Sequence, residues 1–436
     1  MEWWAVLLLF LAGIIAVLIW GLPVAFAFLL VDIVGVLCFM GPAGLDQMTL
    51  QIFSSLSTFA LTPIPLFILM GEFLFHSGMA YKTLDVMDMW LGRVPGRLSV
   101  LAAGSGVMFA AMSGSTIANT AMLGTVLLPE MRRRGYTTSM AVGPIVAAGP
   151  LAALIPPSSL AVVLASIGRI PVGDMLLGGV GPGVFLGLVF CVYIMIRCWL
   201  NPSLAPQYER TGISLGEKLL GFVTYVLPLG SIVFSVLGLM ILGLATPTEA
   251  AASGAIVTLV VAACYGRLSW KMVVDSFVGT LQITIMVFMI IAASNTFSSL
   301  LAYTGATSRL VATVEGLQVS SLWILIGMNI VVLIMGCFME TIAIMMVTLP
   351  IFMPIITSLD FDSVWFGVIM LVNCETGMLT PPFGMLLFVM KGVAPADITV
   401  EDIVRAAFPY IIIYIASLAV LIAFPPLILW LPSVVR

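Results

Sequence analysis

The chain has 436 residues, of which 62% are hydrophobic and 8% are charged, and its formal net charge is −4. Soluble proteins carry roughly 25% charged residues, so this composition excludes a soluble globular protein. Apolar runs of about 20 residues, long enough to cross a hydrocarbon core of roughly 30 Å, recur along the whole chain and predict an all-α polytopic membrane protein.

The first half of the chain, residues 1–197, opens with three apolar segments at 3–20, 24–40 and 55–77. Glu2 is the only charge before Asp32, so the first segment has no basic flank and is expected to be a span rather than a cleaved signal peptide. Residues 79–97 mix charged side chains with Met and Trp. This pattern indicates an amphipathic arm helix that lies in the membrane interface.

Residues 98–130 are apolar but carry a polar cluster from Ser113 to Asn119 at their middle. A helix that crosses lipid alone would leave these polar groups in hydrocarbon, at a cost of several kcal/mol. We therefore expect a re-entrant hairpin whose tip is enclosed by protein. The next apolar segment, 136–168, contains Pro156-Pro157 and is predicted to be a broken helix, because proline removes a backbone donor and clashes with the preceding turn.

A span at 176–196 ends the first half, and the polar residues 198–218 form the linker to the second half, 219–436. The second half is predicted to contain spans at 219–243, 246–264, 272–302 and 408–432, a hairpin at 320–355 and a broken helix at 364–390. Glu249 follows Thr246 and Pro247, so we interpret it as a structural residue at a helix start.

The two halves repeat one motif at a constant offset of 225 residues. The repeated elements are Thr-Ile-Ala at 116–118 and 341–343, the lone prolines Pro129 and Pro354, and the pairs Pro156-Pro157 and Pro381-Pro382. Polar, proline-broken segments at matching places in two hydrophobic halves indicate the binding site of a secondary transporter.

The positive-inside rule predicts the orientation of these segments. Placing Arg132, Arg133 and Arg134 on the cytoplasmic face brings 13 of the 16 basic residues to that side, and only Arg169, Arg309 and Arg436 to the other. Both termini then lie on the periplasmic side and the hairpins enter from opposite faces. The sequence thus predicts two inverted-topology repeats.

The proline pairs could free backbone carbonyl oxygens, which are suitable ligands for a small dehydrated cation; the alternative is a tolerated kink. Ser113, Ser115, Thr116, Asn119 and Thr120 could serve as ion or substrate contacts, or simply as hydrogen-bonding groups between helices. Glu340 and Glu375 are carboxylates within apolar segments, where charges are rare and usually functional.

No phosphate-binding glycine motif supports ATP hydrolysis, and the six cysteines show no metal-ligand spacing, so no cofactor or transition metal is expected. An intramembrane protease would need a serine–histidine or paired-aspartate arrangement. His76 is the only histidine and lies outside both repeats, and the aspartates cluster in loops. We expect no enzyme activity.

Several strings together resemble the large membrane subunit of the tripartite ATP-independent periplasmic (TRAP) transporters of bacteria and archaea. They are Gly71-Glu72, Ile155-Pro156-Pro157-Ser158, Ala245-Thr246-Pro247-Thr248-Glu249-Ala250-Ala251 and Gly336-Cys337-Phe338-Met339-Glu340. The resemblance covers nearly the whole chain. It implies an elevator-type transporter in the cytoplasmic (inner) membrane that is driven by sodium and imports an organic acid. The implied partners are a periplasmic substrate-binding protein and a small four-helix membrane subunit, which we expect to be a separate chain.

The resemblance also implies two sodium sites. The first would be formed by Ser113, Ser115, Ala152, Ile155 and Pro157, and the second by Gly336, Cys337, Gly377, Thr380 and Pro382. The implied substrate contacts are Ser113, Ser115, Thr116, Asn119, Ser158, Glu340 and Thr341. Ala152, Cys337 and Glu340 stand where the family usually has glycine, threonine and aspartate. The alternative function is a standalone proton-coupled carrier of organic anions that uses Glu340 or Glu375.

Overall fold

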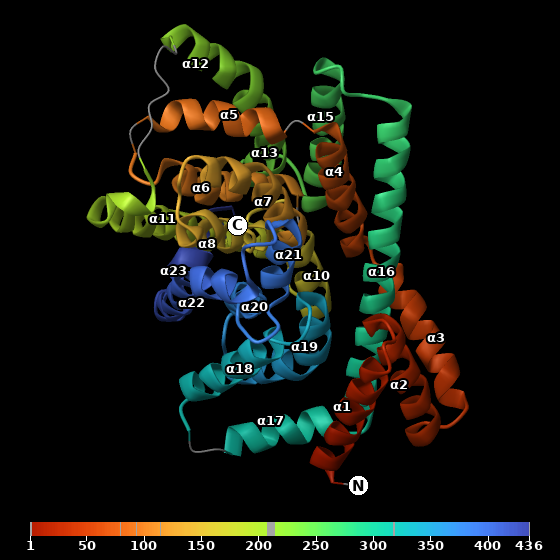
Figure 1. Cartoon of the computed structure of the whole chain (residues 1–436). Coiled ribbons are helices and arrows are strands. Elements are labelled where there is room, and N and C mark those ends of the chain that lie inside the picture. The colour runs from red at the N-terminus through yellow and green to blue at the C-terminus, as the bar shows by residue number, and fades with distance from the viewer. Residues whose placement is uncertain are drawn as a thin grey trace.

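The computed structural model describes residues 2–78, 80–92, 94–113, 115–206, 214–316 and 319–435, without the side chains of 80, 81 and 110–113. Every regular element in these residues is a helix, as the composition predicted (Figure 1). The Ser113 side chain, residues 207–213 of the predicted linker, and Arg93, Arg210 and Arg436 of the charge analysis lie outside the described residues.

Seven helices in the described residues are long and apolar enough to cross a membrane, or eight if one bent pair counts as a single span. The sequence predicted ten. The difference arises because α1 (Trp3–Ile19) and α2 (Val24–Phe39) have only 17 and 16 residues, and because the predicted segment 364–390 is interrupted between α20 (Ser363–Gly377) and α21 (Met385–Val393). The all-helical polytopic fold is confirmed, but its long spans are fewer than expected.

One side of the molecule is built from the upright helices α4 (Pro63–Ser77), α15 (Pro247–Cys264) and α16 (Trp270–Tyr303), with α1, α2 and α3 (Ala43–Leu56) around the lower part of α16 (Figure 1). We call this group the scaffold helices. The Gln51 amide on α3 donates a hydrogen bond to the Asn295 carbonyl of α16 at 3.2 Å. The sequence analysis missed α3, because its polar residues hide the apolar pattern.

The helix start predicted at Glu249 is confirmed. Thr246 caps α15, and its backbone N–H and hydroxyl both donate to a Glu249 carboxylate oxygen at 2.8 Å. The preceding span, Leu215–Ile241, is divided into α12 (Leu215–Gly221), η3 (Phe222–Val226), α13 (Leu227–Val233), η4 (Phe234–Gly238) and α14 (Leu239–Ile241). η3 and η4 are π-helical turns.

Two short helices lie at opposite ends of the molecule, α5 (Ala80–Leu91) near the top of Figure 1 and α17 (Ala306–Gly316) near the bottom. The sequence predicted the first as part of 79–97 but missed the second. Each joins a scaffold helix to a helix pair, since α5 lies between α4 and α6 in the chain and α17 lies between α16 and α18.

Two helix pairs lie where the re-entrant hairpins were predicted. The first is α6 (Arg97–Ser113) with α7 (Thr116–Arg133), and the second is α18 (Ser321–Gly336) with α19 (Thr341–Ser358). By length alone α19 could cross a membrane, but 72% of its apolar window is buried inside the protein, against 22–44% for the other candidate spans. This burial means that α19 is enclosed by protein rather than by lipid.

Both proline pairs interrupt helices at the predicted places, and both Pro-Pro peptide bonds are cis. Around Pro156-Pro157, the segment of α8 (Thr138–Ala148) and α9 (Leu151–Leu154) bends by 48° before α10 (Ser159–Gly168). The remaining elements are α11 (Val172–Leu200), α22 (Val400–Ala423), α23 (Pro426–Val435) and the short helices η1 (Phe59–Leu61) and η2 (Pro202–Leu204). The Tyr414 hydroxyl of α22 donates to the Ala147 carbonyl of α8 at 2.9 Å, which ties the first broken helix to the core.

Candidate functional site

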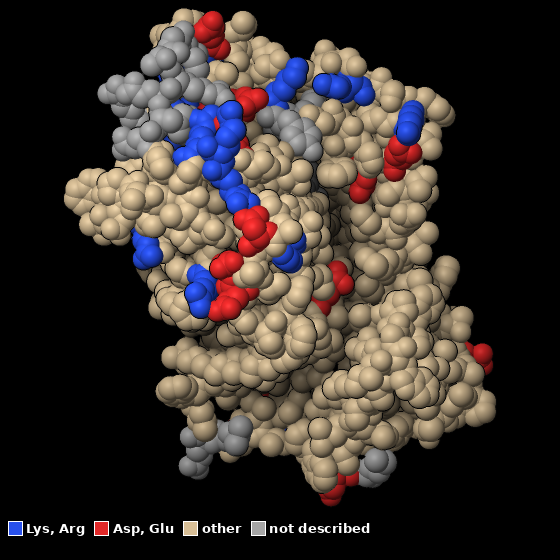
Figure 2. Space-filling model, viewed as in Figure 1, with Lys and Arg blue, Asp and Glu red and all other residues tan. Residues whose placement is uncertain are grey.

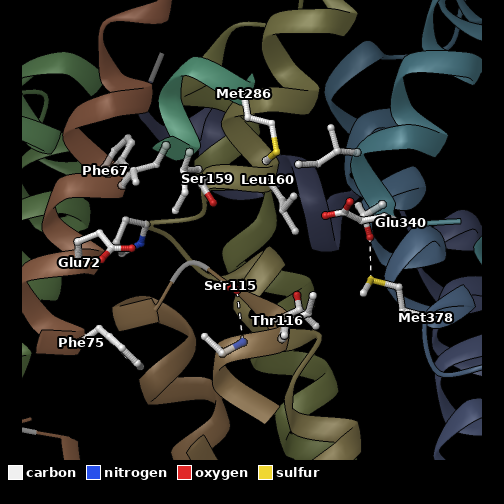
Figure 3. Close-up of a pocket in the computed structure, with 18 residues that line it drawn as sticks. Phe67, Glu72, Phe75, Ser115, Thr116, Ser159, Leu160, Met286, Glu340 and Met378 are labelled. Atoms are coloured by element: carbon white, nitrogen blue, oxygen red, sulfur yellow. Dashed lines mark hydrogen bonds between the residues drawn. The ribbon is translucent and has the colours of Figure 1, made fainter. Parts of the chain in front are cut away.

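A cavity of about 320 Å³ lies between the scaffold helices and the two hairpin tips. The scaffold side is formed by α4 and α16. The opposite wall comes from the first residues of α7 and α19, the break before α10 and Met378 after α20. In Figure 3, Glu72 and Phe75 of α4 lie on one side of the cavity and Glu340 and Met378 on the other. A volume of this size is at the lower end of the range for small-molecule sites.

The cavity brings together five of the predicted site residues: Ser115, Thr116, Pro157, Glu340 and Thr341. Asn119 and Ser158 are fully buried and do not line it. The Asn119 amide donates to the Ala148 carbonyl at 3.3 Å, and the Ser158 hydroxyl accepts from the Ala161 N–H at 3.1 Å as the N-cap of α10. Both side chains thus bond to backbone groups and lie outside this cavity, and their role as substrate contacts stays a prediction.

At the first break, three predicted sodium ligands keep their backbone carbonyl groups unpaired. Among the described residues, no hydrogen bond reaches the carbonyl oxygens of Ala152, Ile155 or Pro157. All three residues are buried. Buried carbonyl groups are normally hydrogen-bonded, so a cluster of unpaired ones is a place where a cation could bind.

At the second break, Gly336 and Gly377 touch through their backbones. A Cβ atom built on Gly336 would lie 2.6 Å from the Gly377 Cα, so no side chain fits at this crossing. The Gly377 and Thr380 carbonyls already accept bonds from the Thr380 and Gly384 N–H groups, at 2.9 and 3.2 Å. Within the described residues no bond reaches the carbonyls of Gly336, Cys337 or Pro382, which leaves three of the five predicted groups unpaired.

One carboxylate links the two hairpin tips. Glu375 of α20 is completely buried, and its two oxygens accept hydrogen bonds from the Thr116 hydroxyl at 2.8 Å and the Thr341 hydroxyl at 3.0 Å. Thr116 and Thr341 are the threonines of the repeated Thr-Ile-Ala motif. The sequence analysis named Glu375 as a functional candidate and as the proton carrier of the alternative function, and missed this bridge. The only signal in the sequence was a carboxylate within an apolar segment and two equivalent threonines in the repeated motif.

The cavity also contains a second carboxylate that the predicted site did not include. Glu72 pairs with His76, one turn further along α4, with 3.3 Å between a carboxylate oxygen and Nδ1. The i, i+4 spacing was the signal for this pair. Glu72 and Glu340 both line the cavity, whereas no lysine or arginine among the described residues does. An anionic solute would therefore need cations other than the side chains of this cavity.

Comparisons with known proteins agree with this geometry. Residues 11–427 match the family model described as "Tripartite ATP-independent periplasmic transporter, DctM component". The chain is 33% identical over 396 residues to the C4-dicarboxylate TRAP transporter large permease protein DctM of Pseudomonas aeruginosa, and the match covers 90% of each chain. It is 30% identical over 408 residues to the isethionate TRAP transporter permease protein DctMQ of Oleidesulfovibrio alaskensis. That match covers 92% of this chain but 62% of the relative.

Among solved structures, the fold resembles the YdaH transporter of Alcanivorax borkumensis. The TM-score is 0.64 at 14% sequence identity, and the match covers 87% of this chain and 88% of that one. At this identity the likeness concerns the fold alone. The family match over nearly the whole chain assigns the protein to its family. It belongs to the large permease (DctM) component of the TRAP transporters and is a transporter permease, not an enzyme.

Proposed function

We propose that this chain imports a small organic acid across the bacterial inner membrane, coupled to sodium, by an elevator movement. The observation that carries the proposal is the cavity between the scaffold helices and the hairpin tips, with unpaired buried carbonyls at the adjoining break. The names of the relatives, which mention C4-dicarboxylates and isethionate, favour a small anion as the solute.

The charges of the cavity favour cation coupling. Glu72 and Glu340 line it, and no basic side chain in the described part of the chain does, so a carboxylate solute would be repelled unless bound cations compensate. Two sodium ions at the two breaks would supply that compensation. Each ion that moves fully across the membrane adds about 2.3 kcal/mol per 100 mV. A dicarboxylate with two sodium ions is neutral, so use of the membrane potential requires a third ion or a monoanionic solute.

The elevator movement would carry the hairpins and broken helices past the scaffold helices. The cavity wall has α4 and α16 on one side and the hairpin tips on the other. Its two sides therefore belong to the two bodies that would move past each other. The arms α5 and α17, at opposite ends of the molecule, would connect the two bodies (Figure 1). In this scheme the two halves are inverted repeats, and both termini lie on the periplasmic side.

A TRAP permease implies two partners, a periplasmic binding protein that delivers the solute and a small membrane subunit. The relative named DctMQ is longer than this chain, which covers 62% of it. We propose that the small subunit braces the scaffold helices, whose outer faces expose large apolar side chains such as Leu281 and Ile285 of α16.

The first test is a thermal melt of the purified chain in detergent, with sodium titrated against potassium and choline at fixed ionic strength. An ion that binds only the folded state adds about 2.7 kcal/mol to the free energy of unfolding at a hundredfold excess over its Kd. We expect a saturable rise in melting temperature with sodium alone. Identical curves for the three cations would reject strong sodium binding by this subunit.

Transport in proteoliposomes then separates the proposal from a proton-coupled carrier. We expect uptake to need both a sodium gradient and the binding protein. Uptake that proceeds without the binding protein and follows a proton gradient would instead identify the carrier that uses Glu340 or Glu375.

A further inference from the structure

A second cavity, of about 250 Å³, lies where the arm helix α5 meets the scaffold. It is lined by Gly78, Lys82, Tyr225, Leu229, Tyr265, Gly266 and Arg267. None of these residues belongs to the transport cavity described above. The residues come from three separate segments of the chain, 78–82, 225–229 and 265–267, so the fold rather than a local motif assembles this site.

The cavity lies at the level where candidate spans end. Gly78 directly follows the span Phe59–Ser77, and Tyr265 directly follows the span Pro247–Cys264. Figure 2 shows basic side chains, with some acidic ones among them, over α5 and near the upper ends of α15 and α16. Tyrosine and basic residues at a span end are typical of the headgroup layer of a membrane.

Two positive charges converge on the cavity. Lys82 of α5 and Arg267 of the α15–α16 loop are both exposed, and no acidic side chain of the described residues forms an ion pair with either. The Lys82 ammonium lies 3.5 Å from the Tyr225 hydroxyl and 5.3 Å from the centre of its ring. Tyr225 in turn stacks on Tyr265, with 5.9 Å between ring centres.

The helices α4 and α15 also end beside this cavity, and the carbonyl groups of their C-termini carry partial negative charge. Each helix end is equivalent to roughly half an elementary charge, so together they offset about one of the two full positive charges. A net positive cavity remains, with tyrosine hydroxyls as further hydrogen-bond donors. The buried Leu229 and the tyrosine rings give it an apolar wall.

We propose that this cavity binds the phosphate of an anionic phospholipid headgroup. The guanidinium of Arg267 would hold the phosphate oxygens in a fork, the Lys82 ammonium would supply the second charge, and the apolar wall would receive the start of an acyl chain. A free phosphate ion shares the charged part of this chemistry but not the apolar part.

Binding there would fasten the arm to the scaffold. Besides Lys82, the Thr83 hydroxyl of α5 donates to the Tyr225 carbonyl at 3.3 Å, so the first turn of the arm already touches the span Leu215–Ile241, whereas Arg267 directly follows the scaffold helix α15. A lipid held by Lys82 and Arg267 at once would add a second connection. This site needs only that the chain crosses a membrane, so it does not depend on sodium coupling.

The experiment measures lipid binding by the full chain in dodecyl maltoside, from the rise of its melting temperature. The probes are dioctanoyl phosphatidylglycerol, dioctanoylglycerol, which has the same acyl chains without phosphate, and inorganic phosphate. We expect saturable stabilisation by phosphatidylglycerol only. Saturation by inorganic phosphate at similar concentrations would assign the site to the free ion. Equal stabilisation by phosphatidylglycerol and dioctanoylglycerol would overturn the phosphate site.

Two pairs of substitutions locate the binding. Lys82→Gln with Arg267→Gln removes both charges of the cavity, whereas Lys218→Gln with Lys271→Gln removes two charges that do not line it. Each basic residue near an anionic headgroup contributes roughly fivefold, so the first pair should weaken binding about twenty- to thirtyfold and the second little. Equal losses in both pairs would mean general surface attraction and reject the site. If the first pair does not fold, Arg267→Gln alone should still weaken binding about fivefold, and Lys82→Arg should retain it.

Discussion

The two proline breaks share a sequence motif but lie in different surroundings. At the first break Pro156 and Pro157 are buried, and the carbonyls of Ala152, Ile155 and Pro157 are unpaired within the described residues. At the second break Pro382 is exposed, and two of the five predicted carbonyls, those of Gly377 and Thr380, already accept hydrogen bonds. The first break therefore encloses a set of unpaired carbonyl groups, whereas the second is more open.

The helices that begin beside the two breaks also differ in their N-caps. In the first half, Ser115 and Ser158 cap α7 and α10 with their hydroxyls. In the second half, Glu340 and Gly384 precede α19 and α21 without a side-chain cap. The helix starts at the first break are therefore capped by side chains, whereas those at the second break are not, and there Gly336 and Gly377 contact each other through their backbones. The two breaks should fail through different substitutions.

The largest effect is expected at the backbone contact between Gly336 and Gly377. In Gly377→Ala the new methyl carbon would lie 2.5 Å from the Gly336 Cα, and backbone yields less readily than a side chain. Overpacking of this kind costs about 1–3 kcal/mol or more, and the displacement separates α18 from α20. We expect uptake in proteoliposomes to fall at least about tenfold and the melting temperature to drop; Gly377→Leu should abolish uptake.

The matched variant is Ala152→Gly, which makes the opposite exchange at the position 225 residues earlier. It removes one buried methyl group and adds backbone freedom, at a cost of about 1 kcal/mol. If Gly377→Ala transports and melts like the wild type, the two backbones do not approach as closely as described here.

The second largest effect is expected at Glu375, which connects the halves. Glu375→Leu leaves the buried hydroxyls of Thr116 and Thr341 without their carboxylate acceptor, and each unsatisfied buried group costs about 1–3 kcal/mol. Glu375→Gln keeps the size of the side chain and one carbonyl acceptor. We expect Leu to abolish uptake and Gln to retain a measurable part of it.

The same pair of variants tests proton coupling, because glutamine cannot carry the proton. Loss of proton-driven uptake in Glu375→Gln, with normal folding by thermal melt, would contradict a purely positioning role for Glu375. The experiment thereby distinguishes a bridge between the tips from a proton carrier.

The sequence predicted the parts of this site that depend on local chemistry. The hairpins, expected at 98–130 and 320–355, form within a few residues of those limits, because polar clusters and prolines mark their tips and ends. The proline pairs broke the helices as expected. Local patterns suffice where one residue type, such as proline, enforces the structure.

The features that were missed depend on contacts between distant segments. Glu375 is 259 residues from Thr116, and no periodicity shows that they meet. The arm α17 was missed although its Arg309 and Glu315 also make it amphipathic; it carries two charges where its counterpart α5 carries three. Fewer long apolar helices form than the ten predicted spans, because apolar content does not fix helix length: α1 and α2 have only 17 and 16 residues, and the segment 364–390 is interrupted.

A smaller effect, specific to sodium affinity, is expected from the prolines themselves. Pro157→Ala adds a buried N–H, and the carbonyl four residues earlier, that of Ala153, already accepts the Ser158 hydroxyl at 2.5 Å. Regaining helix there would consume carbonyls of the proposed first sodium site. We expect a several-fold rise in the sodium concentration that gives half of the maximal increase in melting temperature. We also expect sodium-dependent uptake to be lost at low sodium. In Pro382→Ala the new N–H is exposed at the surface, so the half-maximal sodium concentration of this variant should rise less. Equal rises in the two variants would mean that burial does not distinguish the breaks.

The smallest effect compares the two helix starts at 115 and 340. The Ser115 hydroxyl accepts a hydrogen bond from the Ala118 N–H at 3.3 Å, so Ser115→Ala should lower the free energy of unfolding by about 1 kcal/mol. Glu340 makes no capping bond, so Glu340→Gln should leave the melt nearly unchanged while it alters the KM for the solute or sodium, because its side chain faces the cavity. The two substitutions therefore distinguish a residue that stabilises the hairpin tip from one that contacts the transported solute or ion. If Glu340→Gln changes neither KM nor sodium dependence, Glu340 is a packing residue, and the second tip contributes to the cavity through its backbone and Thr341.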